Sequence, residues 1–314
     1  MTREELLAHP VQIGTRGSAL ALWQSNHVRD QLRAHWGEAL QVELNIISTK
    51  GDQIQDRPLH EVGGKGLFVK AIEARLLDET VDLAVHSMKD MPALGPEGLE
   101  IACTPEREDP RDALVGREGE SVALADLPAG ARVGTGSLRR GALVHRINPG
   151  AEVVPIRGNV PTRVGLVDKG EVDVVILAAA GLRRLDMGAR ISEVLSEDAF
   201  LPAPAQGILA LQCRASDARM KALLAPLADA DTTVRAAAER GFLVRLEASC
   251  TVPLACHATL SGDSITVRGM VVDPSGEPCY EATQTGSRED ANAIGVAVAE
   301  ALLEQGAGAI VERH

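Results

Sequence analysis

The chain has 314 residues, of which 45% are hydrophobic, so it is long enough for two or three domains and too apolar to be disordered. Its net charge of −12 and its three Phe, two Trp and one Tyr argue against nucleic-acid binding, which favours basic surfaces and aromatic stacking platforms. The longest apolar run, residues 174–182, is too short to cross a bilayer, and the first residues do not form a secretory signal. We therefore expect a cytoplasmic protein without membrane contact, and five cysteines without a CxxC pattern do not indicate a disulfide framework.

The first hundred residues alternate between predicted strands and helices. Helices are expected after Ser18, a good N-cap, and after a glycine-rich loop that ends at Gly66. Backbone N–H groups at such a helix start favour an anion, although a plain flexible connection is the alternative interpretation. The polar segment 105–112 contains two prolines and marks an expected domain crossing. The predicted strands are residues 11–15, 42–48, 81–87 and 99–104.

The next hundred residues resemble the first in pattern. QIGTRGS at 12–18 is echoed by RVGTGS at 132–137, and VDLAV at 81–85 is echoed by VDVVI at 172–176. We therefore expect two duplicated βαβ lobes with a cleft between them. A strand at 208–213 is expected to return to the first lobe, which gives two crossings, as in a hinge.

The last part of the chain predicts a small α+β domain. It should contain a helix, three antiparallel strands separated by two turn signals, and a closing helix. The expected ranges are 233–247, 258–260, 264–272, 279–285 and 289–303.

Residues 132–163 hold six arginines and one glutamate, a net charge of +5 in an acidic chain. Arginine binds carboxylate and phosphate groups bidentately. Several of these arginines follow strand-like runs, and ligands of open α/β sheets bind outside the carboxyl ends of the strands. We interpret the stretch as one wall of a pocket for an acidic small molecule. A solvated face with salt bridges is the alternative, and charge alone does not choose between them.

Asp90 and Cys250 are the residues best placed for chemistry. Asp90 follows an apolar strand and Lys89, where a carboxylate can donate and accept protons; most aspartates at strand ends are only turn formers. Cys250 lies in a predicted loop between a helix and a sheet, where a thiolate can form a covalent bond to a substrate or cofactor.

The other cysteines fit structural roles. Cys103 and Cys213 lie inside apolar strands and are expected to be buried, and Cys279 lies in the predicted hairpin. A metal site made of Cys250, Cys256 and His257 ranks low, because the spacing matches no common zinc pattern and a fourth ligand is lacking nearby.

Nine motifs, taken in order, resemble the porphobilinogen deaminase (hydroxymethylbilane synthase) family and cover nearly the whole chain. They are IGTRGSALALWQ, EVGGKGLFVK, DLAVHSMKDMP, EREDPRDA, VGTGSLRR, IRGNVPTR, ILAAAGLRRL, LPAPAQG and RLEASCTVP. The resemblance implies an α/β fold class: two periplasmic-binding-protein-like βαβ lobes around a cleft and a small C-terminal α+β domain with a three-stranded antiparallel sheet. The expected domains are 1–104 with 205–227, 105–204 with the arginine-rich cleft wall, and 228–314 with the cysteine.

The activity implied by this resemblance is that of a transferase of tetrapyrrole biosynthesis. Such an enzyme joins four porphobilinogen molecules head to tail on a covalent dipyrromethane cofactor, releases ammonia, and then frees linear hydroxymethylbilane by hydrolysis. By motif position, Asp90 is the implied catalytic residue, and Cys250 carries the cofactor through a thioether. The implied cofactor-binding residues are Lys89, Thr135, Ser137, Arg139, Arg140 and Arg163. The implied substrate-binding residues are Arg16, Ser18, Lys65, Phe68, Arg157, Asn159 and Gln206. No metal is expected, and the protein is expected to be a monomer.

Three departures from the family pattern concern loops: Glu61, Gly136 and the pair Ala248-Ser249. Glu61 puts one expected cation in doubt, and Gly136 puts one expected hydroxyl contact in doubt. The pair Ala248-Ser249 puts in doubt the mobility of the loop before Cys250. The main competing hypothesis is a non-catalytic, two-lobed cytoplasmic polycarboxylate-binding protein, which needs neither Cys250 nor the third domain. A metal-dependent hydrolase is a weaker third hypothesis, and it predicts activity lost to chelators.

Overall fold

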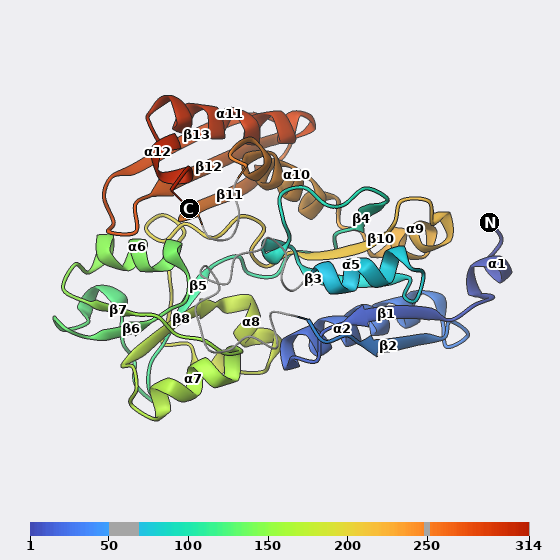
Figure 1. Ribbon diagram of the computed structural model, residues 1–314, viewed down its shortest axis with the longest axis horizontal. Coiled ribbons are helices and arrows are strands. Elements are labelled where there is room, and N and C mark those ends of the chain that lie inside the picture. The colour runs from blue at the N-terminus through green and yellow to red at the C-terminus, as the bar shows by residue number, and fades with distance from the viewer. Residues whose placement is uncertain (50–68, 248–251, 314) are drawn as a thin grey trace. The chain divides into compact units, whose positions relative to one another are not determined.

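The computed structural model describes residues 1–49, 69–247 and 252–313 (Figure 1). The chain divides into two compact units. The first comprises residues 1–56, 64–107 and 208–233, and the second comprises residues 57–63, 108–207 and 234–314. No helix in the described ranges is both long and apolar enough to cross a membrane.

The first unit is built on a five-stranded sheet with the order β2-β1-β3-β10-β4. Strand β1 is parallel to β2 and β3, whereas β10 is antiparallel to both β3 and β4. The expected return of the chain after residue 207 is therefore confirmed. The strands are β1 (Val11–Thr15), β2 (Val42–Ile46), β3 (Leu83–Ser87), β4 (Leu99–Cys103) and β10 (Leu209–Arg214).

The second unit contains a sheet of the same design, with the order β7-β6-β8-β5-β9. Strand β6 is parallel to β7 and β8, and β5 is antiparallel to both β8 and β9. In this second sheet the antiparallel strand β5 comes before the other strands in the sequence. In the first sheet the antiparallel strand β10 comes after the other strands. The strands are β5 (Asp112–Val115), β6 (Arg132–Gly134), β7 (Glu152–Val154), β8 (Val174–Ala178) and β9 (Glu193–Val194).

The predicted internal duplication is confirmed in contacts as well as in strand order. Asp82 accepts the backbone N–H of Gln12 at 2.9 Å, and Asp173 accepts that of Arg132 at 2.8 Å. A Cβ on Gly14 would lie 3.0 Å from Ile72, and one on Gly134 would lie 3.0 Å from Val175. In each lobe the glycine has no side chain of its own, so a neighbouring side chain can approach strand β1 or the corresponding strand β6 closely.

Helices cover both faces of each sheet (Figure 1). In the first lobe, α2 and α9 contribute Val28, Leu32 and Met220 to the main core, and α5 packs Ile72 and Leu76 on the opposite face. In the second lobe, α6 covers one face and α7 the other. The helices are α1 (Arg3–Leu7), α2 (Ala19–Trp36), α5 (Lys70–Leu77), α6 (Leu138–Ile147), α7 (Val160–Asp168), α8 (Ala179–Arg184) and α9 (Ala218–Leu224).

The C-terminal part of the second unit is the expected small α+β domain with a three-stranded antiparallel sheet, β11-β12-β13. Ala255, Met270 and Val272 of this sheet join the core beneath α6. The elements are α10 (Ala230–Arg245), β11 (Leu254–Ser261), β12 (Ser264–Val272), β13 (Cys279–Ser287), α11 (Ala291–Glu304) and α12 (Gly308–Val311).

Several predicted boundaries were wrong by a few residues. Helix α10 begins at Ala230 rather than 233, because Asp229 accepts the backbone N–H of Thr232 at 2.7 Å and caps the helix earlier. Strand β11 begins at Leu254 rather than 258, because its ladder with β12 extends to the pair Leu254–Val271. The prediction of fold class is confirmed, while the three domain boundaries stay a prediction.

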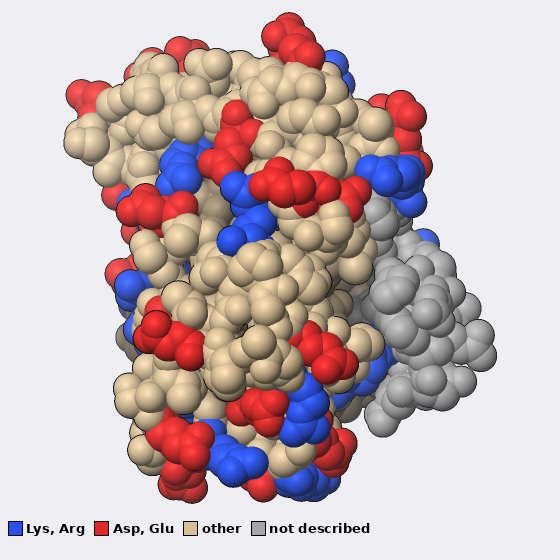
Figure 2. Space-filling view, turned by 90° about the vertical axis from the view of Figure 1, so that its left-hand side faces the viewer, with Lys and Arg blue, Asp and Glu red and all other residues tan. Residues whose placement is uncertain are grey.

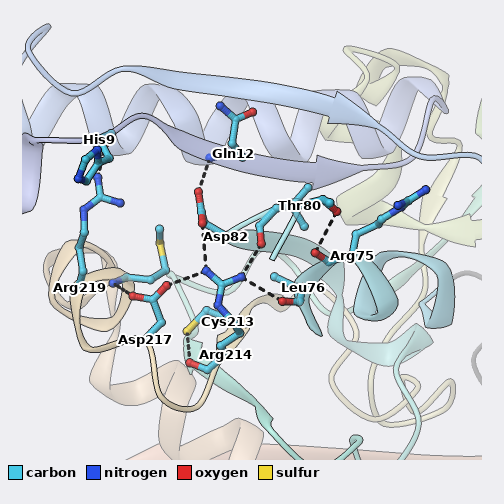
Figure 3. Close-up of polar contacts among 12 residues, drawn as sticks. His9, Gln12, Arg75, Leu76, Thr80, Asp82, Cys213, Arg214, Asp217 and Arg219 are labelled. Carbon is cyan, nitrogen blue, oxygen red and sulfur yellow. Dashed lines mark hydrogen bonds and ion pairs between the residues drawn. The ribbon is translucent and has the colours of Figure 1, made fainter. Parts of the chain in front are cut away.

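Arg214, at the end of β10, ties together three segments of the first unit (Figure 3). Its guanidinium donates to the carbonyls of Leu76 and Val81 at 3.0 and 2.7 Å, and to the carboxylates of Asp82 and Asp217 at 3.0 and 3.1 Å. The late strand β10 is thus joined to the turn that precedes β3 by charge-assisted hydrogen bonds.

Candidate functional site

A small pocket lies in the first unit at the carboxyl ends of β1 and β3. Its volume is about 70 Å³. Two of its residues, Arg16 and Ser18, come from the turn after β1, and Asp90 comes from the turn after β3. The carboxyl ends of parallel strands are where open α/β sheets bind ligands. The pocket therefore combines a cation, a hydroxyl and a carboxylate at a favourable edge.

Asp90 is held by a short 3-10 turn, Met88–Asp90, directly after β3. Met88 is 1% exposed and anchors this turn, and the Met91 N–H closes it on the Met88 carbonyl at 3.1 Å. The Asp90 side chain is exposed, and Lys89 beside it is half-buried. The carboxylate is thus fixed at its base and open to a ligand, as proton transfer requires.

Helix starts position hydroxyl groups in both lobes. The Ser18 hydroxyl caps α2 by accepting the Ala21 N–H at 3.4 Å, and the Ser137 hydroxyl caps α6 by accepting the Arg140 N–H at 3.4 Å. Thr135 is buried, and its hydroxyl accepts the Ser137 N–H at 3.2 Å. In the second lobe these caps bring Arg139 and Arg140 into the first turn of α6.

Arg139 and Arg140 share one fully buried carboxylate, that of Asp112. The Arg139 guanidinium lies 2.8 Å from Asp112 Oδ2, and the Arg140 guanidinium lies 2.7 Å from Oδ1. Burial lowers the pKa of Arg139, and the negative charge of Asp112 opposes that shift. Two guanidinium groups with one carboxylate leave a net positive charge, so the cluster is suited to a further anion.

Gln206 belongs to the same buried cluster. Its amide donates to the Pro110 carbonyl at 2.7 Å and to Asp112 Oδ1 at 3.0 Å, and its Oε1 accepts from Arg140 at 3.4 Å. The preceding N–H, of Ala205, is bound by the buried carboxylate of Glu239 at 2.5 Å. Gln206 therefore fixes the orientation of Asp112 and Arg140.

The arginines of residues 132–163 do not share one role. Arg132 binds Asp173 at 2.9 Å, and Arg146 binds Glu277 at 2.5 Å, in salt bridges at least partly open to solvent. Arg146 and Glu277 both line a pocket of about 470 Å³ in the second unit, whereas the interpretation of the whole stretch as one pocket wall stays a prediction. Figure 2 shows the side of the molecule that lies at the left in Figure 1, and there Lys and Arg side chains are interspersed with Asp and Glu side chains. Only the buried pair Arg139 and Arg140 forms a compact cationic cluster within the described part of this stretch.

Three further predicted residues follow β7. Asn159 caps α7, because its Oδ1 accepts the Thr162 N–H at 2.9 Å. Arg163 donates through Nε to the Gly158 carbonyl at 2.8 Å, and Arg157 is half-buried in the turn between them and β7. The turn is thus ordered by two of the residues expected to bind ligand.

Lys65, Phe68 and Cys250 lie outside the described residues, so their predicted roles stay predictions. The predicted burial of Cys103 and Cys213 is confirmed. Burial raises the pKa of Cys103 to about 12 and the pKa of both Cys213 and Cys279 to about 11, so these three thiols stay protonated at neutral pH.

Sequence reasoning missed several polar residues at or beside these sites. Gln24 donates to the Ser87 hydroxyl at 2.9 Å, and both line the pocket that contains Asp90. His86 lines the same pocket, and Asp112 is the buried partner of the arginines. A histidine near the end of the apolar run VDLAVHS and an aspartate at the start of the apolar run DALV were the available signals.

The fold and site define an α/β protein with charged side chains at the carboxyl ends of its parallel strands. Two family models match: "Porphobilinogen deaminase, dipyromethane cofactor binding domain" over residues 11–222 and "Porphobilinogen deaminase, C-terminal domain" over residues 233–304. The chain belongs to the porphobilinogen deaminase family.

Relatives named porphobilinogen deaminase are similar over almost the full length. The one from Syntrophobacter fumaroxidans is 49% identical, covering 96% of this chain and 97% of its own. The one from Syntrophotalea carbinolica is 51% identical, covering 96% and 95%. Among solved structures, the periplasmic VFT2 domain of Bordetella pertussis BvgS is 18% identical over 71% of this chain and 88% of its own, with a TM-score of 0.41.

Proposed function

We propose that the chain is a hydroxymethylbilane synthase, a transferase that condenses four porphobilinogen molecules head to tail, with release of ammonia, and then releases linear hydroxymethylbilane. The observation that carries the proposal is the family match, which spans both residues 11–222 and residues 233–304 at about half identity to the named relatives. The competing polycarboxylate-binding hypothesis does not account for the match to the C-terminal domain.

Asp90 is the proposed catalytic residue. Porphobilinogen must lose its amine as ammonia, which needs a proton at the leaving nitrogen, and the ring that attacks must lose a proton from carbon. A carboxylate fixed at its base and open to the pocket can deliver and take up these protons and can stabilise positive charge on a pyrrole N–H. Arg16 and Ser18, in the same pocket, are the proposed ligands of the substrate carboxylates.

The residues of the second unit fit the dipyrromethane cofactor that the family domain binds. Its acetate and propionate groups are carboxylates, and the cluster of Arg139, Arg140 and Asp112 has a net positive charge to receive one. Thr135, Ser137 and Arg163 are the further proposed ligands from this unit, and Lys89 of the first unit is proposed as well. Dipyrromethane, when bound, supplies the free pyrrole carbon to which the first substrate ring is joined.

Cys250 is the proposed attachment site of the cofactor. Three of the four described thiols, those of Cys103, Cys213 and Cys279, have a raised pKa and are poor nucleophiles at neutral pH. Cys250 follows α10 in the motif that matches the family's cysteine. Lys65, Phe68, Arg157, Asn159 and Gln206 complete the set of residues proposed to line the substrate or cofactor sites.

The decisive test is the intact mass of the purified protein together with its turnover of porphobilinogen. We expect the wild type to exceed its sequence mass by two linked pyrroles and Cys250→Ser to show the sequence mass alone. Cys279→Ser is the matched control, and it should keep both the added mass and the activity. A wild type that neither gains pyrrole mass on incubation with porphobilinogen nor releases ammonia would favour the binding-protein hypothesis.

A cytoplasmic location and a monomeric state are part of the proposal. Light scattering of the loaded protein would test the second, and a mass of two chains would contradict it.

A further inference from the structure

A chain of three buried polar side chains runs through the first lobe to the pocket that contains Asp90. His86 Nε2 lies 3.0 Å from Gln212 Oε1, and Gln212 Nε2 donates to Glu73 Oε1 at 3.1 Å. His86 is 6% exposed, Gln212 2% and Glu73 6%. Polar groups so deeply buried have lost their hydration and depend on one another for hydrogen bonds.

The sheet register explains how the three residues meet. His86 on β3 lies opposite Ala210 on β10, and Gln212 lies opposite Ala84, so all four side chains are on one face. The two small alanines leave room for Gln212 to reach diagonally to His86. Glu73 comes from the inner side of α5, the helix that covers this face.

The second lobe shows that this fold does not require the polar chain. When Gly14 is matched with Gly134 and Ala84 with Val175, His86 corresponds to Leu177 and Gln212 to Val115. Both counterparts are buried and belong to an apolar core that α7 covers. The polar chain therefore has no counterpart in the equivalent core, although burying it is costly. A role of this polar chain at the adjacent pocket, which contains Asp90, explains why the chain is present.

Hydrogen-bond chemistry fixes which ring nitrogen of His86 carries the proton. A carboxylate can only accept, so the NH2 of Gln212 points to Glu73 and its carbonyl oxygen points to His86. An oxygen acceptor requires a donor, so the proton is on Nε2. Burial lowers the pKa of His86 to about 4, so the ring is neutral at neutral pH and Nδ1 holds a lone pair.

Nδ1 is the ring atom available to a ligand. Within residues 1–49, 69–247 and 252–313, the side chain of His86 has Gln212 as its hydrogen-bond partner, through Nε2. The ring itself lines the pocket with Arg16, Ser18 and Asp90. A lone pair fixed at this wall accepts an N–H group and repels a carboxylate.

We infer that His86 contacts porphobilinogen, accepting one of its N–H groups at Nδ1, and that Gln212 and Glu73 are positioning residues that hold the ring in the Nε2–H form. The inference rests on the proposed function and adds an orientation rule to it. The pyrrole or aminomethyl N–H of the substrate faces His86, and its carboxylates turn toward Arg16.

Nitrogen NMR of the histidine-labelled full-length protein, loaded with its cofactor, tests the ring state without reference to activity. The His86 resonances are assigned by their loss in His86→Gln. We expect wild-type His86 to show a protonated Nε2 and an unprotonated Nδ1. In Glu73→Gln the partner amide can point either way, so a mixture of the two forms is expected. A protonated Nδ1 in the wild type would overturn the inference.

Kinetics with a matched pair of variants test the contact. His86→Gln can keep a donor toward Gln212 but has no acceptor at the position of Nδ1, so KM for porphobilinogen should rise about fivefold to tenfold with kcat little changed. His86→Asn keeps an acceptor there and should restore most of the KM. An unchanged KM in His86→Gln, or an equal rise in both variants, contradicts the inference while the wild type remains active. A wild type without turnover would instead remove the proposed function, and with it the substrate assigned to His86.

Discussion

The two lobes use one backbone plan and differ in which core positions are polar. In the first lobe, His86 and Gln212 stand where the second has Leu177 and Val115. In the second lobe, Asp112 pairs with Ala178 on β8, whereas its counterpart Leu209 pairs with Ser87 on β3. The two lobes therefore share the arrangement of strand ends and differ in the polar residues beneath them.

The same comparison holds at the first helix of each lobe. When the capping residues Ser18 and Ser137 are aligned, Ala21 of the first lobe corresponds to Arg140 of the second. The buried acid Asp112, which binds Arg140, is found in the same lobe as the arginine. Each polar group is thus accompanied by its partner in the same lobe.

Removing Asp90 is expected to have the largest effect on activity. Asp90→Asn keeps the shape of the side chain but removes its proton chemistry, so turnover of porphobilinogen should fall roughly 10²–10⁴-fold. Asp90→Glu should also lose most of its rate, because the carboxylate is displaced from the short turn. Single-turnover release of ammonia by loaded protein measures this, and the exposed residue Glu97 provides the control Glu97→Gln. A near-normal rate in Asp90→Asn would remove the proposed catalytic role.

Removing Asp112 is expected to have the largest effect on stability. Asp112→Ala leaves Arg139 and Arg140 buried without a carboxylate, which should cost about 3–5 kcal/mol of unfolding free energy. Denaturant unfolding followed by circular dichroism measures the loss, and Asp126→Ala, at an exposed position, should change it little. A loss no larger than that of Asp126→Ala would mean that the arginines have another anion in the free protein.

His86 should make the stability of the first lobe depend on pH. Its pKa is about 4 when folded against an ordinary value of 6.5, so between these pH values the unfolded ring binds a proton and the folded ring does not. Stability contributed by the neutral ring is therefore full above pH 6.5 and falls by about 3 kcal/mol as the pH drops to 4. The difference between wild type and His86→Gln, measured by unfolding over this range, should change by that amount. A pH-independent difference would show that the ring titrates normally.

The smallest expected effect concerns the duplicated aspartates. Both accept a backbone N–H and bind an arginine, but Asp82 is 22% exposed and is bound by Arg214, whereas Asp173 is 38% exposed and is bound by Arg132. We expect Asp82→Ala to cost about 2 kcal/mol and Asp173→Ala about 1 kcal/mol, because solvent weakens the more exposed pair. Parallel unfolding curves would measure both, and the reverse order would contradict the comparison.

The sequence predicted the repeat, the approximate strand positions and the acid after β3, because these depend on local patterns such as GT–Ser and VD followed by apolar residues. It did not predict that Asp112 lies against Arg139 and Arg140, because that contact joins residues 27 or 28 positions apart across two strands and a helix. Nor did it separate Arg146, bound to Glu277, from the buried arginines. The charge pattern of a sequence does not show which residues become neighbours of a charged side chain when the chain folds.

The place of β10 has a consequence for how the chain is made. It lies between β3 and β4, yet it is synthesised about a hundred residues after them, when all the strands of the second sheet already exist. On a ribosome, the second sheet can therefore form while the first still has a gap between β3 and its edge strand β4, with the facing edges of these two strands unpaired. The N-terminal part of this protein is the first to emerge, and it cannot complete its sheet until the lobe that follows it has been translated.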